Sequence, residues 1–225
     1  MRRILTGGDL NLRSYGTASS GSTGVTRPHA PRRYSRGMTP VTLHTARLTL
    51  SPPTSDDVDA IFAACQDPDV QRYTTVPTPY LREHAVGFVE KAAGWWEDGT
   101  ELTWGIRHDD ELVGMIGLHR VARGNAEIGY WMAPGGRRRG FPTEAARAVI
   151  AFGFAADGAA LSRIEWRAVV GNIGSARLAR AVGIRYEGLL RQSLLNGAGE
   201  RFDAWVGGLL ASDDRMPRPW PPLGD

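Results

Sequence analysis

The sequence predicts one α/β domain of the α+β kind, with a mixed, mostly antiparallel sheet of about seven strands and helices on both faces. Three observations lead to this prediction. Segments with strand-like alternation and segments with helical periodicity follow one another between residues 41 and 210. Three consecutive strand segments are separated by short turn sequences, which is typical of an antiparallel meander. The length of 225 residues accommodates one such domain with a further segment at either end.

Both ends of the chain differ in composition from this central part. Residues 1–40 are dominated by Gly, Ser, Thr, Arg and Pro and show no apolar periodicity. Such a segment cannot offset its ordering entropy by burial, so we expect a disordered basic extension there. Met38 stands directly before the first strand-like segment and is an alternative start of the natural protein. Residues 211–225 are rich in proline and are expected to form a second disordered tail.

Charge and cysteine content limit the class of protein. The formal net charge is +3, but residues 1–37 hold seven arginines and one aspartate, which leaves 3 − 6 = −3 for the rest. A nucleic-acid-binding surface on the domain is therefore not expected. Cys65 is the only cysteine, so no intramolecular disulfide can form. Because no apolar run approaches the ~20 residues that span a bilayer, we expect a cytoplasmic protein without a membrane partner.

The expected elements follow from caps, turns and periodicity. Thr54 to Asp57 supply an N-cap and an acidic first turn for a helix whose buried stripe holds Val58, Ile61, Phe62 and Cys65. Further helices are expected at 82–96, 143–155 and 174–182. The expected strands are 47–51, 102–107, 112–121, 126–132, 164–170, 186–195 and 202–210. The last two are joined by Asn196 to Gly199, a strong hairpin sequence.

The most informative stretch runs from Glu127 to Ala145. A strand ends at Met132, a loop rich in glycine and arginine follows, and a helix begins directly after it. The free N–H groups and the positive end of such a helix favour an anion, and three arginines add charge-assisted hydrogen bonds that suit a pyrophosphate. A solvated basic turn is the alternative interpretation. The stretch is neither a Walker loop nor a Rossmann fingerprint, because the required spacings of glycine and lysine are missing.

This stretch resembles the acetyl-CoA signature of the GNAT superfamily, Arg/Gln-x-x-Gly-x-Gly/Ala. The match is Arg137-x-x-Gly140-x-Pro142, and the proline is a departure from the pattern. Further phrases resemble the RimJ/RimL-type branch: Thr45 to Leu50, Asp67 to Val70, and Asn172-x-x-Ser175-Ala176-Arg177-Leu178 leading to Gly183. The resemblance covers about residues 43 to 210. It implies a sheet that splays between the fourth and fifth strands, with the pantetheine arm of the donor in the gap, and a dimer is common in this branch.

The resemblance also implies roles for the binding residues. The backbone N–H near Met132 would hold the developing negative charge on the thioester carbonyl. Asn172 would hold the pantetheine arm or line the adjacent pocket. The pyrophosphate of acetyl-CoA would be bound by the loop and the first helical turn, at Arg137, Arg138, Arg139, Gly140, Pro142 and Thr143.

Two residues are candidates for proton transfer. Glu127 is the candidate base for the attacking amine, directly or through a water, because it lies on the strand that carries the carbonyl donor. Its alternative is an exposed strand carboxylate paired with an arginine. Ser175 is the candidate acid that reprotonates the departing thiolate, as the resemblance implies. Its alternative is capping of the helix that begins after Asn172, and the two roles are compatible.

Other reactive residue types receive structural interpretations. Cys65 lies on the apolar stripe of the first helix and is expected in the core, which disfavours a covalent acyl-cysteine. The five histidines show no spacing typical of a metal site, so no metal is expected. Four aromatic residues are expected mainly to pack, with a substrate pocket as the alternative: Tyr73, Trp95, Trp96 and Trp104.

The predicted function is N-acetyl transfer from acetyl-CoA to a primary amine, by direct transfer in a ternary complex. A protein or peptide N-terminal amine is the first expectation for the acceptor. A small-molecule amine, with an acetyl or succinyl donor, is the enzymatic alternative. The alternative from another class is an acyl-CoA-binding regulatory module without turnover.

Overall fold

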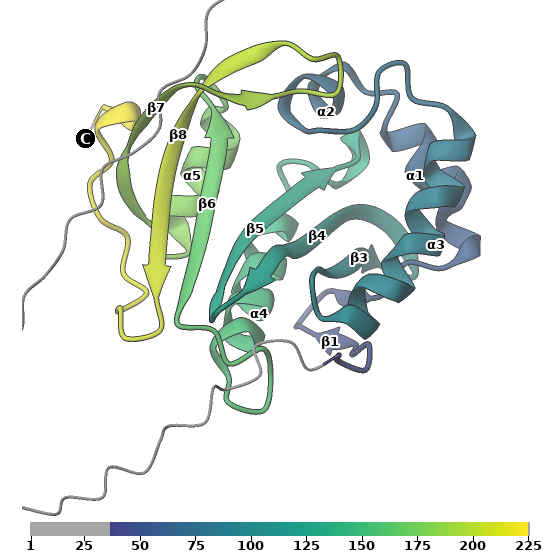
Figure 1. Ribbon diagram of the computed structural model, residues 1–225, viewed down its shortest axis with the longest axis horizontal. Coiled ribbons are helices and arrows are strands. Elements are labelled where there is room, and N and C mark those ends of the chain that lie inside the picture. Colours follow the sequence, from purple (N-terminus) through teal and green to yellow (C-terminus); the bar gives the residue numbers. More distant parts are fainter. Residues whose placement is uncertain (1–36, 225) are drawn as a thin grey trace, which may run out of the picture. The chain divides into compact units, whose positions relative to one another are not determined.

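A computed structural model describes residues 37–224 of the chain (Figure 1). Most of the expected basic extension, residues 1–36, lies outside the described residues, as does Asp225. The described part holds one eight-stranded sheet in the order β1-β2-β3-β4-β5-β6-β8-β7. Every neighbouring pair is antiparallel except β5 and β6, which run parallel. The mixed, mostly antiparallel sheet predicted from the sequence is therefore confirmed.

The strands are β1 (Leu43–His44), β2 (Thr49–Ser51), β3 (Leu102–His108), β4 (Glu111–Ala122), β5 (Asn125–Met132), β6 (Arg163–Val169), β7 (Arg185–Leu195) and β8 (Arg201–Leu210). The α-helices are α1 (Val58–Ala64), α2 (Pro68–Tyr73), α3 (Arg82–Asp98), α4 (Phe141–Phe154) and α5 (Ile173–Ala181). Three short 3-10 helices complete the set: η1 (Ser55–Asp57), η2 (Pro134–Gly136) and η3 (Pro221–Leu223). The two-residue β1 accounts for the eighth strand, one more than expected.

The chain turns where the sequence supplies residues that tolerate a left-handed backbone. Asp109 and Asp110, with φ of 51° and 64°, join β3 to β4. These values match the two positive-φ positions of a tight hairpin turn, which aspartate tolerates better than most residues. Gly99, at φ 64°, ends α3 by donating its N–H to the last carbonyls of the helix. The meander and the end of α3 thus follow from local sequence.

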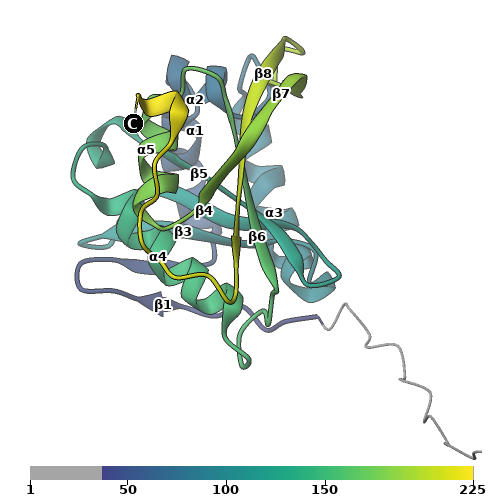
Figure 2. The ribbon, with the colours of Figure 1, turned by 90° about the vertical axis from the view of Figure 1, so that its left-hand side faces the viewer.

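Two apolar clusters lie on opposite faces of the sheet. The larger one contains Ile128 and Trp166 and packs against α4 and α5. The smaller one joins α1 to α3 and includes Trp131 from the sheet. Figure 2 shows α4 and α5 on one side of the strands and α3 on the other. Because side chains alternate along a strand, neighbouring residues of β5 contact different clusters.

The parallel pairing of β5 and β6 is unusually short. Only Asn125, Ala126 and Glu127 have partners on β6, namely Arg163, Ile164 and Glu165. Beyond Glu127 the two strands diverge, and Figure 1 shows the resulting V between them. These strands are the fourth and fifth of the seven expected ones. The splay implied by the resemblance is therefore present.

The C-terminal segment differs from the expected disordered tail. Trp220 is fully buried, and its indole N–H donates to the carbonyl of Ile184 at 3.1 Å. Its ring lies 5.2 Å from that of Trp166 and 5.7 Å from that of Tyr186. A single large aromatic residue therefore anchors a segment whose remaining composition is that of a loop.

The beginning of the described part is also attached to the domain. The N–H of Met38 donates to the carbonyl of Trp96 at 2.9 Å, and the Met38 side chain packs against the larger cluster. The indole N–H of Trp104 donates to the carbonyl of Val41 at 2.8 Å. No helix among residues 37–224 is long and apolar enough to span a bilayer.

Replacing Trp220 tests whether the C-terminal segment belongs to the folded domain. We expect Trp220→Ala to lower the free energy of unfolding by about 3–5 kcal/mol, because the cavity left by a buried tryptophan is large. Met216→Ala, at a 64% exposed residue of the same segment, is the matched control and should change it by less than about 0.5 kcal/mol. Chemical denaturation measures both. Equal stability of the two variants would contradict this anchoring role.

Candidate functional site

The edge of β5 that faces β6 carries backbone groups without a strand partner. The N–H of Ala133 donates to the carbonyl of Val113 at 3.0 Å, and β4 and β5 pair without a register shift from Met132 back to Glu127. Backbone groups of an antiparallel strand point alternately to its two sides. The N–H groups of Met132 and Tyr130 therefore point away from β4, into the splay. The predicted carbonyl donor at Met132 lies where a ligand in the gap could reach it.

The loop after β5 presents further N–H groups. Gly140, at φ 79°, is the N-cap of α4, and the N–H of Glu144 donates to its carbonyl at 3.1 Å. In the part of the chain that the structure describes, the N–H groups of Gly140, Phe141 and Thr143 have no protein acceptor. These are the first donors of a 14-residue helix. The free N–H groups on which the predicted anion site depends are thus present, and anion binding itself stays a prediction.

Pro142 occupies the second position of α4, where the missing N–H costs the helix no hydrogen bond. α4 begins at Phe141, two residues earlier than expected from the sequence. Thr143 and Pro142 are both partly exposed in the first turn. The departure from the family pattern therefore removes one donor at the anion site and leaves the helix intact.

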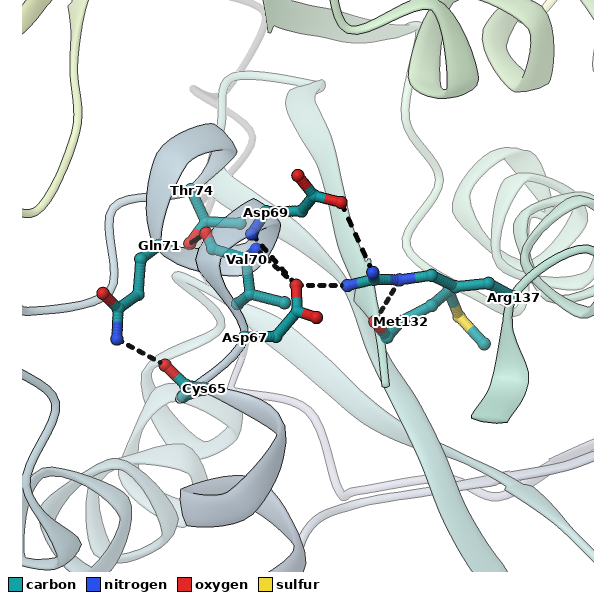
Figure 3. A network of polar contacts seen from close by, with 8 residues as sticks. All are labelled: Cys65, Asp67, Asp69, Val70, Gln71, Thr74, Met132 and Arg137. Carbon is teal, nitrogen blue, oxygen red and sulfur yellow. Dashed lines mark hydrogen bonds and ion pairs between the residues drawn. The ribbon is translucent and has the colours of Figure 1, made fainter. Parts of the chain in front are cut away.

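The three arginines of the loop have different surroundings. Arg137 points away from the helix end, toward the N-terminus of α2, as Figure 3 shows. Its Nη2 donates to Asp67 at 2.6 Å and its Nε to the carbonyl of Met132 at 3.2 Å. The hydrogen bond from Arg137 lowers the pKa of the Asp67 carboxyl, and the backbone N–H groups of Asp69 and Val70 lower it further. The side chain of Arg137 thus ties α2 to the end of β5, which differs from the pyrophosphate contact expected for it.

Arg139 and Arg138 remain at the surface. The guanidinium of Arg139 lies 4.4 Å from the ring centre of Phe141, and its carbonyl accepts a hydrogen bond from Arg47 at 3.1 Å. Arg138 is exposed, with φ of 59°, and has no ion pair among residues 37–224. Of the three arginines, Arg138 is the one whose charge is not already engaged by a described side chain.

The helix end is held against the N-terminal strands by Glu144. Its carboxylate accepts hydrogen bonds from the Thr45 hydroxyl at 2.6 Å and from Nε of Arg47 at 2.8 Å. Burial alone would raise the pKa of Glu144, but these hydrogen bonds and the Arg47 charge outweigh it and lower the pKa. The phrase from Thr45 to Leu50, noted in the sequence, therefore serves to fix the first turn of α4.

A three-residue hydrogen-bond cluster bridges the splay on the α4/α5 face. The Tyr130 hydroxyl on β5 lies 2.9 Å from the hydroxyl of Ser175 on α5. The indole N–H of Trp166 on β6 donates to the Ser175 hydroxyl at 3.0 Å and is shared with Tyr130 at 3.2 Å. An indole nitrogen can only donate, so both hydroxyl oxygens act as acceptors toward Trp166. When Tyr130 donates to Ser175, the Ser175 proton is free to point elsewhere.

Tyr130 itself is held protonated. Burial raises its pKa to about 12, although the hydrogen bonds to Ser175 and Trp166 partly oppose this shift. Ser175 also lies at the start of α5, where its backbone N–H donates to the side-chain oxygen of Asn172 at 3.1 Å. The capping interpretation of Asn172 and Ser175 is therefore confirmed. Since capping uses the backbone N–H of Ser175, its hydroxyl remains available for proton transfer.

Glu127 lies on the opposite face, at the point where β5 and β6 separate. It shares this face with Gly129 and Trp131, and its side chain is 20% exposed. The guanidinium of Arg120 contacts the carboxylate, and Nε of Arg167 lies 3.4 Å from it. The pairing with arginine expected in the alternative interpretation is confirmed, whereas the side chain is more buried than that interpretation assumed. A role of Glu127 in proton transfer stays a prediction.

A pocket of about 410 Å³ opens between α2 and the hairpin that joins β7 to β8. Arg72 and Thr78 line it from one side, and Asn196, Glu200 and Phe202 from the other. Its walls combine a cation, a carboxylate and an aromatic ring. Among the aromatic residues considered for a pocket, Trp96 and Trp104 are fully buried and pack edge to face at 4.9 Å. The packing interpretation holds for these two.

The remaining candidates occupy the core or form no cluster. Cys65 is buried, and burial raises the pKa of its thiol to about 11. A thiol with such a pKa is protonated at neutral pH and a poor nucleophile. Residues 37–224 contain no group of three or more His, Cys, Asp or Glu side chains arranged for a metal ion.

Sequence reasoning missed Tyr130 and Trp166. The alternation of strand residues carried a usable signal, because it places Tyr130 and Trp166 on the face opposite Glu127, the face that α5 covers. The pairing of these two rings with Ser175 depends on how α5 packs across the splay, which no local pattern reveals.

Comparison with known proteins agrees with this geometry. Residues 47–185 match the family model described as acetyltransferase (GNAT) domain. A curated relative is the uncharacterized N-acetyltransferase YoaA of Bacillus subtilis, 37% identical over 154 residues, which cover 67% of this chain and 86% of the relative.

Solved structures share the fold. One is Mycobacterium smegmatis RimJ in complex with CoA-disulfide, with a TM-score of 0.69 and 23% identity, covering 77% of this chain and 90% of that chain. Another is RimL, described as a ribosomal L7/L12 alpha-N-protein acetyltransferase in complex with coenzyme A. It has a TM-score of 0.68 and 18% identity, covering 76% of this chain and 98% of that chain.

Proposed function

The chain belongs to the GNAT family of N-acetyltransferases, and on this premise we propose that it transfers an acetyl group from acetyl-CoA to a protein or peptide N-terminal amine. The single observation that carries the proposal is the splay at Glu127. It combines unpaired backbone donors on β5, a helix N-terminus at Gly140 and a hydroxyl cluster at Ser175 around one gap.

Different groups of the chain suit the successive parts of acetyl-CoA, the pyrophosphate and then the pantetheine arm. The pyrophosphate suits the N–H groups of Gly140, Phe141 and Thr143, with Arg138 as the available cation. The pantetheine arm suits the free edge of β5, whose N–H groups at Tyr130 and Met132 point into the gap. Arg137 contributes by holding α2 against β5. Acetyl-CoA supplies the activated acyl group.

Acyl transfer develops negative charge on the thioester oxygen, so a fixed donor at that oxygen lowers the barrier. We assign this role to the backbone N–H of Met132. The amine nitrogen attacks the thioester carbon, the carbon–sulfur bond breaks, and the departing thiolate takes a proton. Ser175 is positioned to give that proton, because Tyr130 and Trp166 both direct hydrogen bonds at its oxygen. No covalent acyl-enzyme is needed.

The attacking amine must first lose a proton. We assign this step to Glu127. Its carboxylate takes the proton directly, or it positions a water molecule that takes the proton. Glu127 and Ser175 lie on opposite faces of the sheet at the same gap. The proton of the amine therefore leaves on one face and the proton for the thiolate arrives from the other. This separation suits direct transfer in a ternary complex.

The proposed acceptor rests on one pocket and on the chemistry of the amine. The pocket at Arg72, Asn196 and Glu200 opens between two elements and could hold the residues that follow an N-terminal amine. An α-amino group, with pKa ~8, also needs less help to lose its proton than a lysine at ~10.4. RimL, which shares the fold, is described as an alpha-N-protein acetyltransferase. A cytoplasmic location would bring such substrates together with acetyl-CoA.

Thiol release tests the proposed function directly. Purified protein with acetyl-CoA should release free CoA in the presence of peptides with free N-termini and much less with the same peptides after N-terminal acetylation. A panel of small amines, and succinyl-CoA in place of acetyl-CoA, distinguishes the alternative acceptors and donors. Acetyl-CoA binding without thiol release for any amine would indicate a non-catalytic binding module and contradict the proposal.

Glu127→Gln tests the deprotonation step. Because glutamine keeps the shape and loses the negative charge, acetyl-CoA binding should be nearly unchanged while turnover falls by about 10²-fold or more, as for loss of a general base. Glu187→Gln is the matched control, since Glu187 pairs with Arg163 on the same sheet outside the gap. Steady-state kinetics and calorimetric titration measure the two effects. Wild-type turnover of Glu127→Gln at saturating substrates would remove Glu127 from the mechanism.

Pro142→Ala tests the placement of the pyrophosphate. Alanine restores an N–H at the second position of α4 without disturbing the helix. One charge-assisted hydrogen bond is worth about 1.5–3 kcal/mol, part of which Arg138 and the Thr143 hydroxyl already supply. We expect acetyl-CoA to bind severalfold more tightly and saturated turnover to stay within about twofold, because the contact is equal in ground and transition states. Calorimetric titration showing equal or weaker binding would argue against this placement.

A further inference from the structure

A histidine lies directly beside Glu127 on the proposed deprotonation face. His119 on β4 is the register partner of Glu127, and Glu127 is in turn the partner of Glu165 on β6. These three residues form a row across three strands at the vertex of the splay. Opposite residues on neighbouring strands have Cβ atoms about 4.5–5.5 Å apart, so the imidazole and the Glu127 carboxylate are neighbours. His119 is 35% exposed, which leaves it accessible to water.

The imidazole is held in one orientation by a second carboxylate. Nδ1 of His119 lies 3.2 Å from Oε2 of Glu101, directly before β3. A carboxylate only accepts hydrogen bonds, so this contact requires the proton of a neutral imidazole to sit on Nδ1. Nε2 then carries the lone pair. Within residues 37–224, Nε2 has no hydrogen-bond partner.

Two glycines make room for the ring. Gly117 on β4 and Gly129 on β5 are register partners in the middle of the sheet. A Cβ atom on Gly129 would lie 2.9 Å from Nε2 of His119, and one on Gly117 would lie 3.2 Å from it. Glycine inside a strand weakens the strand and often marks a close approach of another group. Here that group is the imidazole, which lies along β5 toward the open half of the splay.

The surroundings of the ring contain buried polar atoms that lack hydrogen bonds. Across residues 37–224 two buried side-chain oxygens have no hydrogen bond, Oγ1 of Thr103 and Oε2 of Glu127. Thr103 is the register partner of Gly117, and Glu127 that of His119. Oε2 of Glu127 is nevertheless engaged, because the guanidinium groups of Arg120 and Arg167 both contact this atom as ion pairs. A buried oxygen without a partner indicates a water or ligand that completes its bonding. Among the described residues only Oγ1 of Thr103 is of this kind, and Thr103 lies on the same face of the sheet as the imidazole.

We propose that His119, oriented by Glu101, accepts the proton of the attacking amine through a water that Glu127 holds in place. This inference rests on the proposed function and chooses the water-mediated route for its first step. The ammonium gives a proton to the water, the water gives one to Nε2, and the imidazole becomes an imidazolium whose Nδ1–H stays on Glu101. The freed nitrogen lone pair then attacks the thioester. Histidine is the side chain that most often acts as a general base in enzymes.

His119→Ala tests the proposal, with imidazole added back as a probe. We expect turnover to fall by about 10²-fold at saturating substrates, while the dissociation constant of acetyl-CoA stays within about twofold. Imidazole in the assay should restore part of the turnover, because Gly117 and Gly129 leave a hollow for the ring. The weakly basic 1,2,4-triazole, of nearly the same size, should not restore it. His44→Ala, at an exposed histidine of β1, is the matched control and should have wild-type turnover.

Turnover of His119→Ala within twofold of wild type, or equal restoration by imidazole and triazole, would overturn the proposal. Should His119→Ala lose acetyl-CoA binding through misfolding, two other variants carry the test. Glu101→Gln removes the carboxylate that orients the ring, and Gly129→Ala places a methyl group against Nε2. Both should lower turnover at least about tenfold with acetyl-CoA binding retained. Wild-type turnover in both would overturn the proposal.

The same measurements separate this proposal from the function on which it rests. Wild-type protein that turns over no amine would overturn the proposed function and the role of His119 with it. Wild-type turnover combined with a fully active His119→Ala would overturn the role of His119 alone and leave Glu127 as the base.

Discussion

The three-residue pairing between β5 and β6 is the constraint on which the site depends. Backbone N–H and C=O groups inside a protein need hydrogen-bond partners. From Tyr130 to Met132 the inner edge of β5 has none on β6, because β6 has already diverged toward β8. The fold therefore leaves a row of unsatisfied donors at the centre of its sheet. A ligand with amide and carbonyl groups, such as a pantetheine arm, has the groups that would satisfy these donors.

Contacts between several elements surround this splay. On one face Tyr130, Trp166 and Ser175 connect β5, β6 and α5 through shared hydrogen bonds. Trp220 packs on Trp166 from the C-terminal segment, so the last described residues support the hydroxyl cluster. At the end of β5, Arg137 joins the strand to the N-terminus of α2. Each of these contacts links elements that are distant in sequence, and each involves β5 or β6.

Local sequence was sufficient for part of this arrangement. The meander, the glycine end of α3 at Gly99 and the helix start after the arginine loop follow from turn, cap and periodicity rules, which act over a few residues. The partner of Arg137 was not predictable, because Asp67 lies 70 residues earlier in the chain. Composition also misled for the C-terminal segment, since one buried Trp220 outweighs the loop-forming residues around it. The faces of Glu127 and Tyr130 follow from strand alternation, but their neighbours depend on packing.

The two faces of the splay have opposite chemical character, and this difference is compatible with the two proton transfers that we propose. The Ser175 face is a set of neutral hydrogen-bond groups, and burial keeps the Tyr130 hydroxyl protonated. In the transfer we propose, Ser175 gives a proton to the departing thiolate, and the negative charge left on its oxygen is stabilised by hydrogen bonds from Tyr130 and Trp166 until a proton returns from solvent. The Glu127 face carries carboxylates, guanidinium groups and an imidazole, with access to solvent. We propose that the positive charge from the amine is accepted there, with the carboxylate of Glu101 as the negative partner of the imidazole.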